Sequence, residues 1–416
     1  MYGESGAALE IGPEPSAYAP GDVVFTFSYL SWSAAARRGW FGTEDRLARS
    51  LVEHEGVRRV LICDRARSLP LKLLRERFAT DSEPFPADER RGLLAPTRLR
   101  RGDPTSLRGV ERSFAAYGRA MERGAQSMGL EEPVVITTQP LVAAFADLSW
   151  ARAVTYYALD DWTVHPQYRR WWPAYGEAYR RIRERGHRVA AVSGALLERL
   201  SPSGAGLVVP NGLEPLEWSV SAERAETPAA PNTRAAPAAA NPRAGKLVDL
   251  PRALLIYAGT LDARLDIEWL RETARAMPAA RIALVGPIVD DAHVRRLREE
   301  PNIEIRAPLP RAELAELMRN ADVGLVPHLR TPLTETMSPL KLYEYLAGGL
   351  PVVATDLEPM RGIDSRVLLV GEGGNFAGAA RAALALGRAE ERDRRAFVQA
   401  NSWRSRHDAL LELAFS

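Results

Sequence analysis

The segment from Thr336 to Thr355, TMSPLKLYEYLAGGLPVVAT, carries residue types that can hold a diphosphate. Ser338 is expected to cap a helix that has Pro339 at its first position. The backbone N–H groups in the region from Ser338 to Leu340 then point out of the helix, where the helix dipole attracts phosphate. The segment therefore predicts an anion site at the start of a helix.

Lys341 and Glu344 are three residues apart and share one face of this expected helix. A cation in the first turn opposes the helix dipole, and a bound anion removes that conflict. Glu344 lies about six residues past the cap, roughly 9 Å along the axis, which is near the separation between the diphosphate and the ribose of one nucleotide. The pair predicts a nucleotide-diphosphate site; the alternative is a surface ion pair on an ordinary helix.

Aromatic residues crowd positions 156–179, YYALDDWTVHPQYRRWWPAYGEAY. Aromatic rings stack on the C–H faces of sugars, so the enrichment indicates a carbohydrate site, and the alternative is a helix that packs an aromatic stripe onto a sheet. Asp161 or His165 is a candidate base or orients an acceptor hydroxyl, whereas Asp160 is equally well explained as a cap. The adjacent carboxylates diverge on most backbones, so we expect no obligatory metal.

Strands are needed to position these residues, and short apolar runs predict twelve of them. In the first half the runs are 23–27, 60–63, 134–137, 154–157, 189–192 and 207–209. In the second half they are 254–257, 282–285, 303–305, 323–326, 352–354 and 367–370. Helical patterns separate most of them, and Asp266 is expected to cap one such helix. The alternation predicts an α/β fold of two doubly wound parallel sheets.

Composition divides the chain. We expect a flexible N-terminus at 1–20 and an acceptor-side Rossmann-like domain at 21–215. Residues 216–249 are rich in Ala and Pro without an apolar period and predict a linker insertion. A nucleotide-binding domain is expected at 250–398, and an amphipathic helix at 399–416 is expected to cross back to the first domain.

The overall composition excludes several classes of protein. Of the 416 residues, 55 are Lys or Arg and 53 are Asp or Glu, so the net charge of +2 predicts no nucleic-acid partner. The single cysteine, Cys63, excludes an internal disulfide and a zinc site built on cysteine pairs. With neither a secretory signal nor a long apolar run in view, we expect a cytoplasmic protein. The arginine-rich stretch 64–123 is either a solvated surface or a patch that meets an anionic acceptor or the inner face of the membrane.

The segment 336–355 resembles the nucleotide-sugar motif of GT-B glycosyltransferases, particularly the retaining group related to glycogen and sucrose synthases. Within that group it is similar to bacterial cell-surface polysaccharide and teichuronic-acid-type transferases. Four further passages agree in family order: VVPNGLEPLEW, IYAGTLDARLDIEWL, ARIALVGP and ELMRNADVGLVPHL. The resemblance covers most of residues 150–416 and is thin before Ala151.

The resemblance implies two Rossmann-like domains that face each other across a cleft. It also implies transfer of a hexosyl unit from a nucleotide-diphosphate sugar to a hydroxyl of a carbohydrate or lipid-linked acceptor, in cell-surface polysaccharide or glycoconjugate synthesis. The configuration at the anomeric carbon is retained, with a donor phosphate oxygen as the proton acceptor. No cofactor other than the donor substrate is implied.

Family positions carry over residue by residue. Arg264 matches the basic residue on the donor diphosphate, Gly259 permits close backbone approach, and Lys341 is the second cation. Glu344 matches the second glutamate of a two-glutamate motif, whereas Thr336 occupies the position of the first. Because of that departure, two alternatives stay open: a nucleotide-sugar 2-epimerase of the same architecture, and a non-catalytic scaffold.

Overall fold

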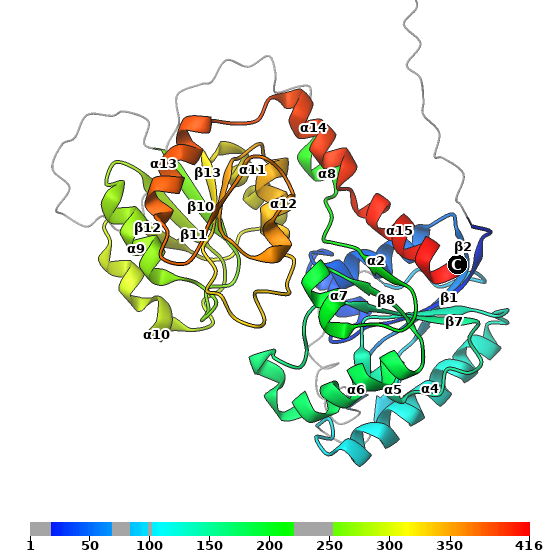
Figure 1. Ribbon diagram of the computed structural model, residues 1–416. Helices are drawn as coiled ribbons and strands as arrows, with labels where there is room; N and C mark the ends of the chain where they lie inside the picture. The colour runs from blue at the N-terminus through cyan, green and yellow to red at the C-terminus, as the bar shows by residue number, and fades with distance from the viewer. Residues whose placement is uncertain (1–17, 69–83, 99–101, 220–252) are drawn as a thin grey trace, which may run out of the picture.

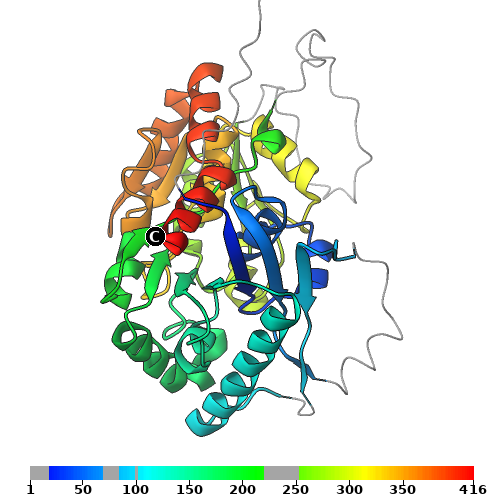
Figure 2. The ribbon, with the colours of Figure 1, turned by 90° about the vertical axis from the view of Figure 1, so that its right-hand side faces the viewer.

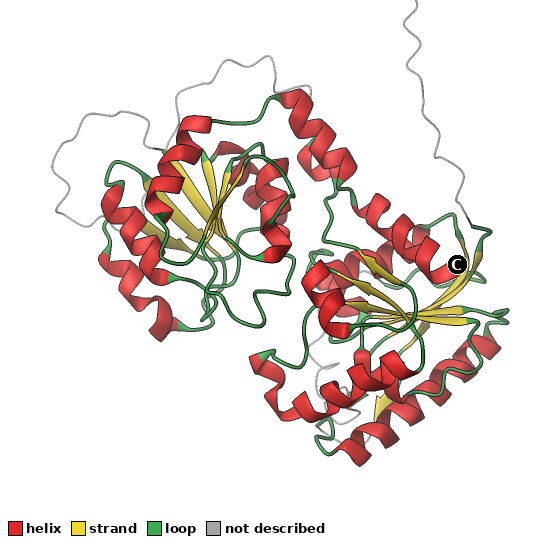
Figure 3. Ribbon diagram, viewed as in Figure 1, coloured by secondary structure: helices red, strands yellow, loops and turns green. Residues whose placement is uncertain are grey.

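The computed structural model describes residues 18–68, 84–98, 102–219 and 253–416 (Figure 1). The flexible N-terminus predicted at 1–20 and the linker predicted at 216–249 lie outside these ranges, except for residues 18–20 and 216–219. The described residues form two α/β units, each with helices on both faces of a sheet (Figure 3). The predicted fold class is confirmed.

The first sheet has seven strands in the described residues, all paired in parallel. Their spatial order is β4 (Arg91–Leu94), β2 (Val57–Cys63), β1 (Gly21–Thr26), β6 (Val134–Thr137), β7 (Ala153–Ala158), β8 (Arg188–Ala191) and β9 (Gly206–Val208). Val23 and Phe25 enter the apolar core on one face, and Val24 enters the core on the other. Burial on both faces explains why these strands are continuous apolar runs.

Helices cover this sheet on both sides. They are α1 (Trp32–Arg37), α2 (Thr43–Glu53), α4 (Leu107–Ser127), α5 (Pro140–Phe145), α6 (Trp172–Glu184) and α7 (Gly194–Leu200), with a 3₁₀ turn η1 (Pro166–Trp171) before α6. Two short strands, β3 (Arg67–Ser68) and β5 (Thr97–Arg98), pair separately. The sequence reading missed β3, β4 and β5, because none of them is a long apolar run.

The second sheet has six parallel strands among the described residues. Their order is β12 (Ile303–Arg306), β11 (Arg281–Val285), β10 (Leu254–Ala258), β13 (Val323–Val326), β14 (Val352–Thr355) and β15 (Val367–Val370). Its helices are α8 (Pro215–Trp218), α9 (Ile267–Ala276), α10 (Asp291–Val294), α11 (Arg311–Asn320), α12 (Leu340–Ala347), α13 (Phe376–Leu386) and α14 (Glu391–Ala400), with 3₁₀ turns η3 (Arg295–Glu299) and η4 (Glu358–Met360). The predicted cap of α9 is confirmed, since Asp266 accepts a hydrogen bond from the Trp269 N–H at 3.1 Å.

The chain passes between the two units twice. The segment that leads to α8 meets the segment between α14 and α15 (Trp403–Phe415), where Leu213 exchanges backbone hydrogen bonds of 2.8 Å with Asn401 and Trp403. Helix α15 then packs on α2 and on β6, β7 and β8 of the first unit. Figure 2 shows α14 and α15 following each other from one unit to the other.

Side chains of the first unit also hold the loop that precedes α12. Ser193 Oγ donates to the Thr336 carbonyl at 2.5 Å, and Asn211 Nδ2 donates to the Ser338 carbonyl at 2.5 Å. The start of α12 is therefore positioned by both units. In the described ranges, none of the helices is both long enough and apolar enough to cross a membrane.

Candidate active site

Helix α12 begins one residue later than predicted. Pro339, not Ser338, occupies the cap position, and no side chain caps the helix. Leu340 and Lys341 are therefore the first helical residues, and their N–H groups belong to the turn that lacks intrahelical acceptors. The structure still places an electropositive helix start at the edge of the second sheet, with the Ser338 carbonyl held from the other unit.

Gly259 ends β10 and makes room for Lys341. A Cβ atom at Gly259 would lie 2.9 Å from both Cε and Nζ of Lys341, and the φ of Gly259 is +146°. Gly286, at the end of β11, has a φ of +152°, and a Cβ there would meet the Gly259 carbonyl oxygen at 2.0 Å. A side chain is thus excluded at both glycine positions, where the backbone can come close to a ligand.

The ammonium group of Lys341 lies against a tyrosine and a histidine. Its Nζ donates to Tyr257 Oη at 3.0 Å, lies 4.3 Å from the centre of that ring, and is 3.4 Å from His328 Nε2. Within the described ranges it forms no ion pair with a carboxylate. Burial, together with the charge of Arg264, lowers the pKa of Lys341 to about 7. A cation so placed is suited to an incoming anion.

His328 is buried beside this ammonium group. Burial and the neighbouring cations Lys341 and Arg264 hold the pKa of His328 well below its usual value, so the ring is neutral. Its Nδ1 is buried without a hydrogen-bond partner in the described structure. His328 thus lines the candidate site beside Lys341.

Arg264 reaches the same region from the loop after β10. Its guanidinium pairs with Asp262 at 2.7 Å, and its carbonyl accepts a hydrogen bond from the Leu329 N–H at 2.7 Å, which ties the loop to the end of β13. About a third of the side chain is exposed. The charge of Arg264 acts on Lys341, His328 and Asp160, so the structure brings the two predicted cations together.

Glu344 is buried one turn further along α12, with only 3% of its surface exposed. Its carboxylate accepts a hydrogen bond from Arg311, which also pairs with Glu217 at 2.8 Å. The Arg311 guanidinium lies over the rings of Phe41 and Trp218. Glu344 therefore belongs to a buried ion-pair network rather than to a surface pair, and its contact with a ribose stays a prediction.

Arg311 was missed by the sequence reading although a signal was present. It is the first residue of α11, where a cation opposes the helix dipole, as Lys341 does in α12. A search for cations in the first turn of a helix would have selected both Arg311 and Lys341.

The two adjacent aspartates after β7 have different surroundings. Asp161, one of the predicted catalytic residues, is fully buried; its carboxylate pairs with Arg199 and accepts hydrogen bonds from the Thr163 N–H at 2.9 Å and hydroxyl at 2.5 Å. These contacts engage Oδ1 of Asp161 with Thr163 and pair its carboxylate with Arg199, and its role as a base stays a prediction. Burial raises the pKa of Asp160 to about 6, opposed by Arg264, so Asp160 is the aspartate that faces the predicted donor side.

His165 lies near the aromatic residues and within electrostatic reach of the Arg264–Asp262 pair. Its ring centre lies 5.1 Å from that of Tyr168 and 6.5 Å from that of Trp162, and its Nδ1 has no partner in the described structure. Burial lowers the pKa of His165, helped by Arg264 and opposed by Asp262. A neutral imidazole within electrostatic reach of the Arg264–Asp262 pair is able to accept a proton or orient a hydroxyl.

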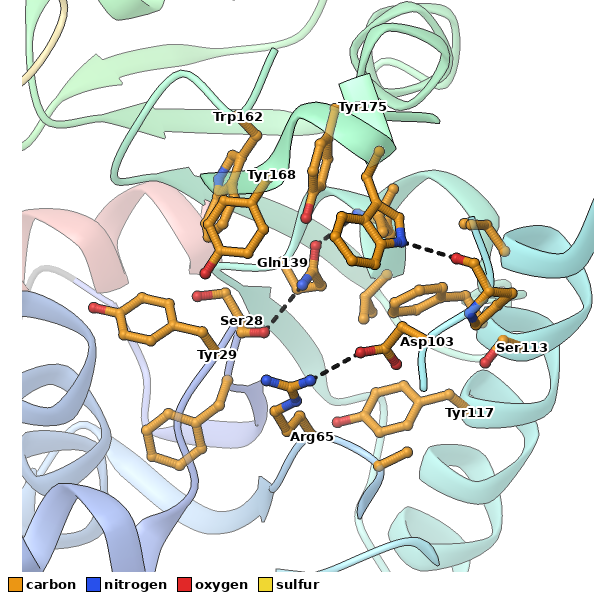
Figure 4. Close-up of a pocket in the computed structure, with 18 of the residues that line it drawn as sticks. Ser28, Tyr29, Arg65, Asp103, Ser113, Tyr117, Gln139, Trp162, Tyr168 and Tyr175 are labelled. Carbon is orange, nitrogen blue, oxygen red and sulfur yellow. Dashed lines mark hydrogen bonds and ion pairs between the residues drawn. The ribbon is translucent and has the colours of Figure 1, made fainter. Parts of the chain in front are cut away.

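Beside His165, an aromatic pocket opens at the carboxyl edge of the first sheet (Figure 4). Four of its lining residues come from the aromatic stretch that was predicted to bind sugar: Trp162, Tyr168, Trp171 and Tyr175. The remaining aromatics have other surroundings: Tyr156 and Tyr157 on β7 and Tyr179 on α6 are core residues, and Trp172 is half-buried at the start of α6. The stretch thus supplies both the sheet packing and a pocket wall.

The arrangement can stabilise negative charge on one side and hold a polar, flat-faced molecule on the other. Lys341 and Arg264 supply the cations, and Asp160 and His165 lie between them and the aromatic pocket. In the described ranges, no cluster of three or more His, Cys, Asp or Glu side chains is arranged to hold a metal ion. The expectation that no metal is required stays a prediction.

Part of the chain is similar to known sequences. Residues 252–387 match the family described as glycosyl transferases group 1. A stretch of 106 residues is 32% identical to TuaH of Bacillus subtilis (strain 168), which is named for glycosyl transfer in teichuronic acid biosynthesis. That stretch spans 25% of this chain and 27% of TuaH, so the match covers about a quarter of the curated relative.

Solved structures match over almost the whole chain. Sucrose-phosphate synthase from Thermosynechococcus elongatus superposes with a TM-score of 0.64 at 16% identity, covering 94% of this chain and 98% of that one. The trehalose 6-phosphate synthase from Burkholderia multivorans gives 0.61 at 14% identity (95% and 98%), and HepE of Anabaena gives 0.54 at 14% (94% and 98%). The chain therefore has the GT-B fold, and its residues 252–387 match the family described as glycosyl transferases group 1.

Proposed function

We propose that the protein transfers a hexosyl unit from a nucleotide-diphosphate sugar to a hydroxyl of a carbohydrate or lipid-linked acceptor. The observation that carries the proposal is the position of Lys341. Its ammonium group lies at the start of α12, against Gly259 and within the field of Arg264, without a carboxylate of its own in the described structure. A diphosphate supplies the missing negative charge.

In the proposed reaction, the bond between the anomeric carbon and the donor phosphate oxygen breaks, and a bond to the acceptor oxygen forms. The acceptor proton passes to the departing phosphate oxygen, and the anomeric configuration is retained, as the family resemblance implies. Arg264 and Lys341 stabilise the charge that grows on the diphosphate. Asp160 and His165 lie where they can orient the acceptor hydroxyl. No metal or other cofactor takes part in this scheme.

Two comparisons support the choice of substrates. The structure of HepE contains UDP and glucose, and TuaH is named for teichuronic acid biosynthesis. We therefore assign the proposed activity to cell-surface polysaccharide or glycoconjugate synthesis on the cytoplasmic side of the membrane. The arginine-rich stretch 64–123 is proposed to provide any peripheral contact with that membrane.

A thermal-shift panel of UDP-, GDP-, ADP- and TDP-sugars tests the donor, because a ligand that binds the native state raises the unfolding midpoint. We expect one nucleotide class to raise the midpoint, and Arg264→Ala to lower transfer at least tenfold. The control is Arg275→Ala, which removes an exposed arginine on α9. A panel without any shift contradicts the proposal, and conversion of the donor alone to an epimer identifies a 2-epimerase instead.

A further inference from the structure

We propose that the aromatic pocket of the first unit binds an acceptor saccharide that carries one anionic group, a carboxylate or a phosphate. The inference rests on the proposed function and specifies the class of its acceptor. It assigns two arginines of the arginine-rich stretch 64–123 to the binding of an anionic acceptor.

Two arginines of that stretch line the pocket and share one carboxylate. Arg65 pairs with Asp103 at 2.9 Å, and Arg98 pairs with the other oxygen of the same carboxylate. Nearby Asp64 does not balance the second guanidinium, since it accepts a hydrogen bond from the Trp32 N–H at 2.7 Å and faces Arg67. The pocket thus holds two guanidinium groups against one carboxylate.

The other titratable groups of the lining do not add charge. They are the four tyrosines Tyr29, Tyr117, Tyr168 and Tyr175, whose pKa values burial raises above the usual value. They remain neutral phenols at physiological pH. Glu44, which lies behind Ser28, accepts hydrogen bonds from the Ser28 N–H at 2.5 Å and hydroxyl at 2.6 Å, and burial raises its pKa. The net charge of the lining is therefore positive.

Arg98 in particular has unused donor capacity. Its side chain is 19% exposed, and its Nε is buried without a hydrogen-bond partner in the described structure. A buried N–H group that lacks an acceptor destabilises the unliganded protein, and an anionic oxygen removes that cost. Guanidinium groups also match the planar carboxylate and phosphate groups in geometry.

The aromatic residues lie opposite the charged ones. Figure 4 shows Trp162, Tyr168 and Tyr175 on one side of the pocket and the Arg65–Asp103 pair on the other. Gln139 lies between them and donates its amide N–H to the Ser28 carbonyl at 3.0 Å. A sugar ring stacked on the aromatic faces can place its anionic substituent at the arginines and direct a hydroxyl toward His165, on the donor side.

The aromatic wall opposite these arginines favours a saccharide over a lipid surface. Other arginines of the same stretch, such as Arg112 and Arg119 on α4, are exposed and do not line the pocket. A membrane surface binds clustered cations on an open face, whereas Arg65, 43% exposed, and Arg98, 19% exposed, both line a hollow whose opposite wall is aromatic. A single small anion on a flat-faced ring fits this geometry.

Titrations followed by NMR test the proposal with three probes: methyl glucuronide, glucose 1-phosphate and neutral methyl glucoside. We expect both anionic probes to bind the wild-type protein at least tenfold more tightly than the neutral probe. Arg65→Gln and Arg98→Gln, singly and combined, should reduce that preference, and the double variant should abolish it. The matched control Arg119→Gln should keep the wild-type preference.

Equal affinity for neutral and anionic probes, no binding of any probe, or a preference that survives the double variant overturns the inference. A stronger response to glucuronide or to the phosphate identifies which anion the acceptor carries. The titrations contain no nucleotide, so their failure is distinct from failure of the donor panel. Arg65→Gln changes a side chain that is 43% exposed, and this variant keeps the test valid if Arg98→Gln fails to fold.

Discussion

Lys341 is the residue whose protonation bears most directly on the proposed donor site. Burial and the charge of Arg264 bring its pKa to about 7, so in the free protein the ammonium and amine forms are both present at neutral pH. Binding of a diphosphate requires the ammonium form. Below pH 7 that form is already present, whereas above pH 7 the protein must take up a proton when the ligand binds.

We therefore predict that affinity for the donor nucleotide sugar falls roughly 25-fold between pH 6.5 and 8.5. Lys341→Met should bind at least tenfold more weakly at pH 6.5, because a charge-assisted contact of about 1.5–3 kcal/mol is lost, and it should lose the pH dependence. Isothermal titration calorimetry at three pH values measures both effects. If the affinity of Lys341→Met still depends on pH, another titrating group causes that dependence.

Asp160 and Asp161 are predicted to respond differently to the same substitution. Asp160→Asn should lower transfer at least tenfold and remove the rise of turnover with pH through about 6, since the carboxylate form is the one that can orient a hydroxyl. Asp161→Asn should instead lower the free energy of unfolding by about 1–2 kcal/mol, because it weakens the contacts to Arg199 and Thr163. Turnover against pH and urea unfolding of both variants separate the two roles. If Asp161→Asn folds but loses turnover while Asp160→Asn keeps it, this assignment is contradicted.

The candidate residues were recognisable from the sequence, but their partners were not. Lys341 is conspicuous because it is a cation at the start of a helix, whereas Tyr257 in β10 and His328 just after β13 meet it only through the order of the sheet. The choice between Asp160 and Asp161 depends on which way each side chain leaves one turn. Neither the composition nor the spacing of the residues specifies the direction in which each side chain points.

At the scale of elements, the ends of β10 and β11 form a narrow backbone platform beneath Lys341. Gly259 and Gly286 have φ values of +146° and +152°, and neither position has room for a Cβ. Because such φ values strain other residues, a side chain at Gly259 combines backbone strain with displacement of the lysine.

Gly259→Ala is predicted to weaken nucleotide binding at least tenfold and to lower the free energy of unfolding by about 1–3 kcal/mol. The control is Gly371→Ala, since a Cβ there meets no atom within 4 Å and that glycine has no positive φ. Calorimetry with the donor and urea unfolding give the two quantities. Donor affinity equal to that of wild type in Gly259→Ala would show that the platform does not position the lysine.

The elements themselves were largely predictable. All twelve expected strands occur, because buried parallel strands leave continuous apolar runs in the sequence. The start of α12 was placed at Ser338 rather than at Pro339, since a serine before a proline satisfies the usual cap pattern although its hydroxyl does not cap the helix. Strand β4 was missed because RGLL is short and only partly buried.

At the scale of the whole molecule, the contacts that join the two units include a set of polar contacts at the start of α12. Asn211 accepts a hydrogen bond from Thr43 in the first unit and donates one to the Ser338 carbonyl in the second. Ser193 makes a parallel contact with the Thr336 carbonyl while it caps α7. The helix start that is proposed to hold the diphosphate is therefore set by the relation between the two units, which no local pattern in the sequence specifies.

Asn211→Ala tests this coupling. We predict that donor affinity falls three- to tenfold, because the loop before α12 loses the contact that fixes it, while binding of saccharide probes in the first unit is unchanged. The control is Asn302→Ala: that side chain donates to the Ala274, Met277 and Ala280 carbonyls, and its hydrogen bonds in the described part of the chain all lie within the second unit. It should lower the unfolding midpoint without changing the affinity of the folded protein for the donor. If Asn302→Ala reduces donor affinity as much as Asn211→Ala does, general loosening of the second unit explains both effects; if only Asn211→Ala does so, the donor site depends on the first unit.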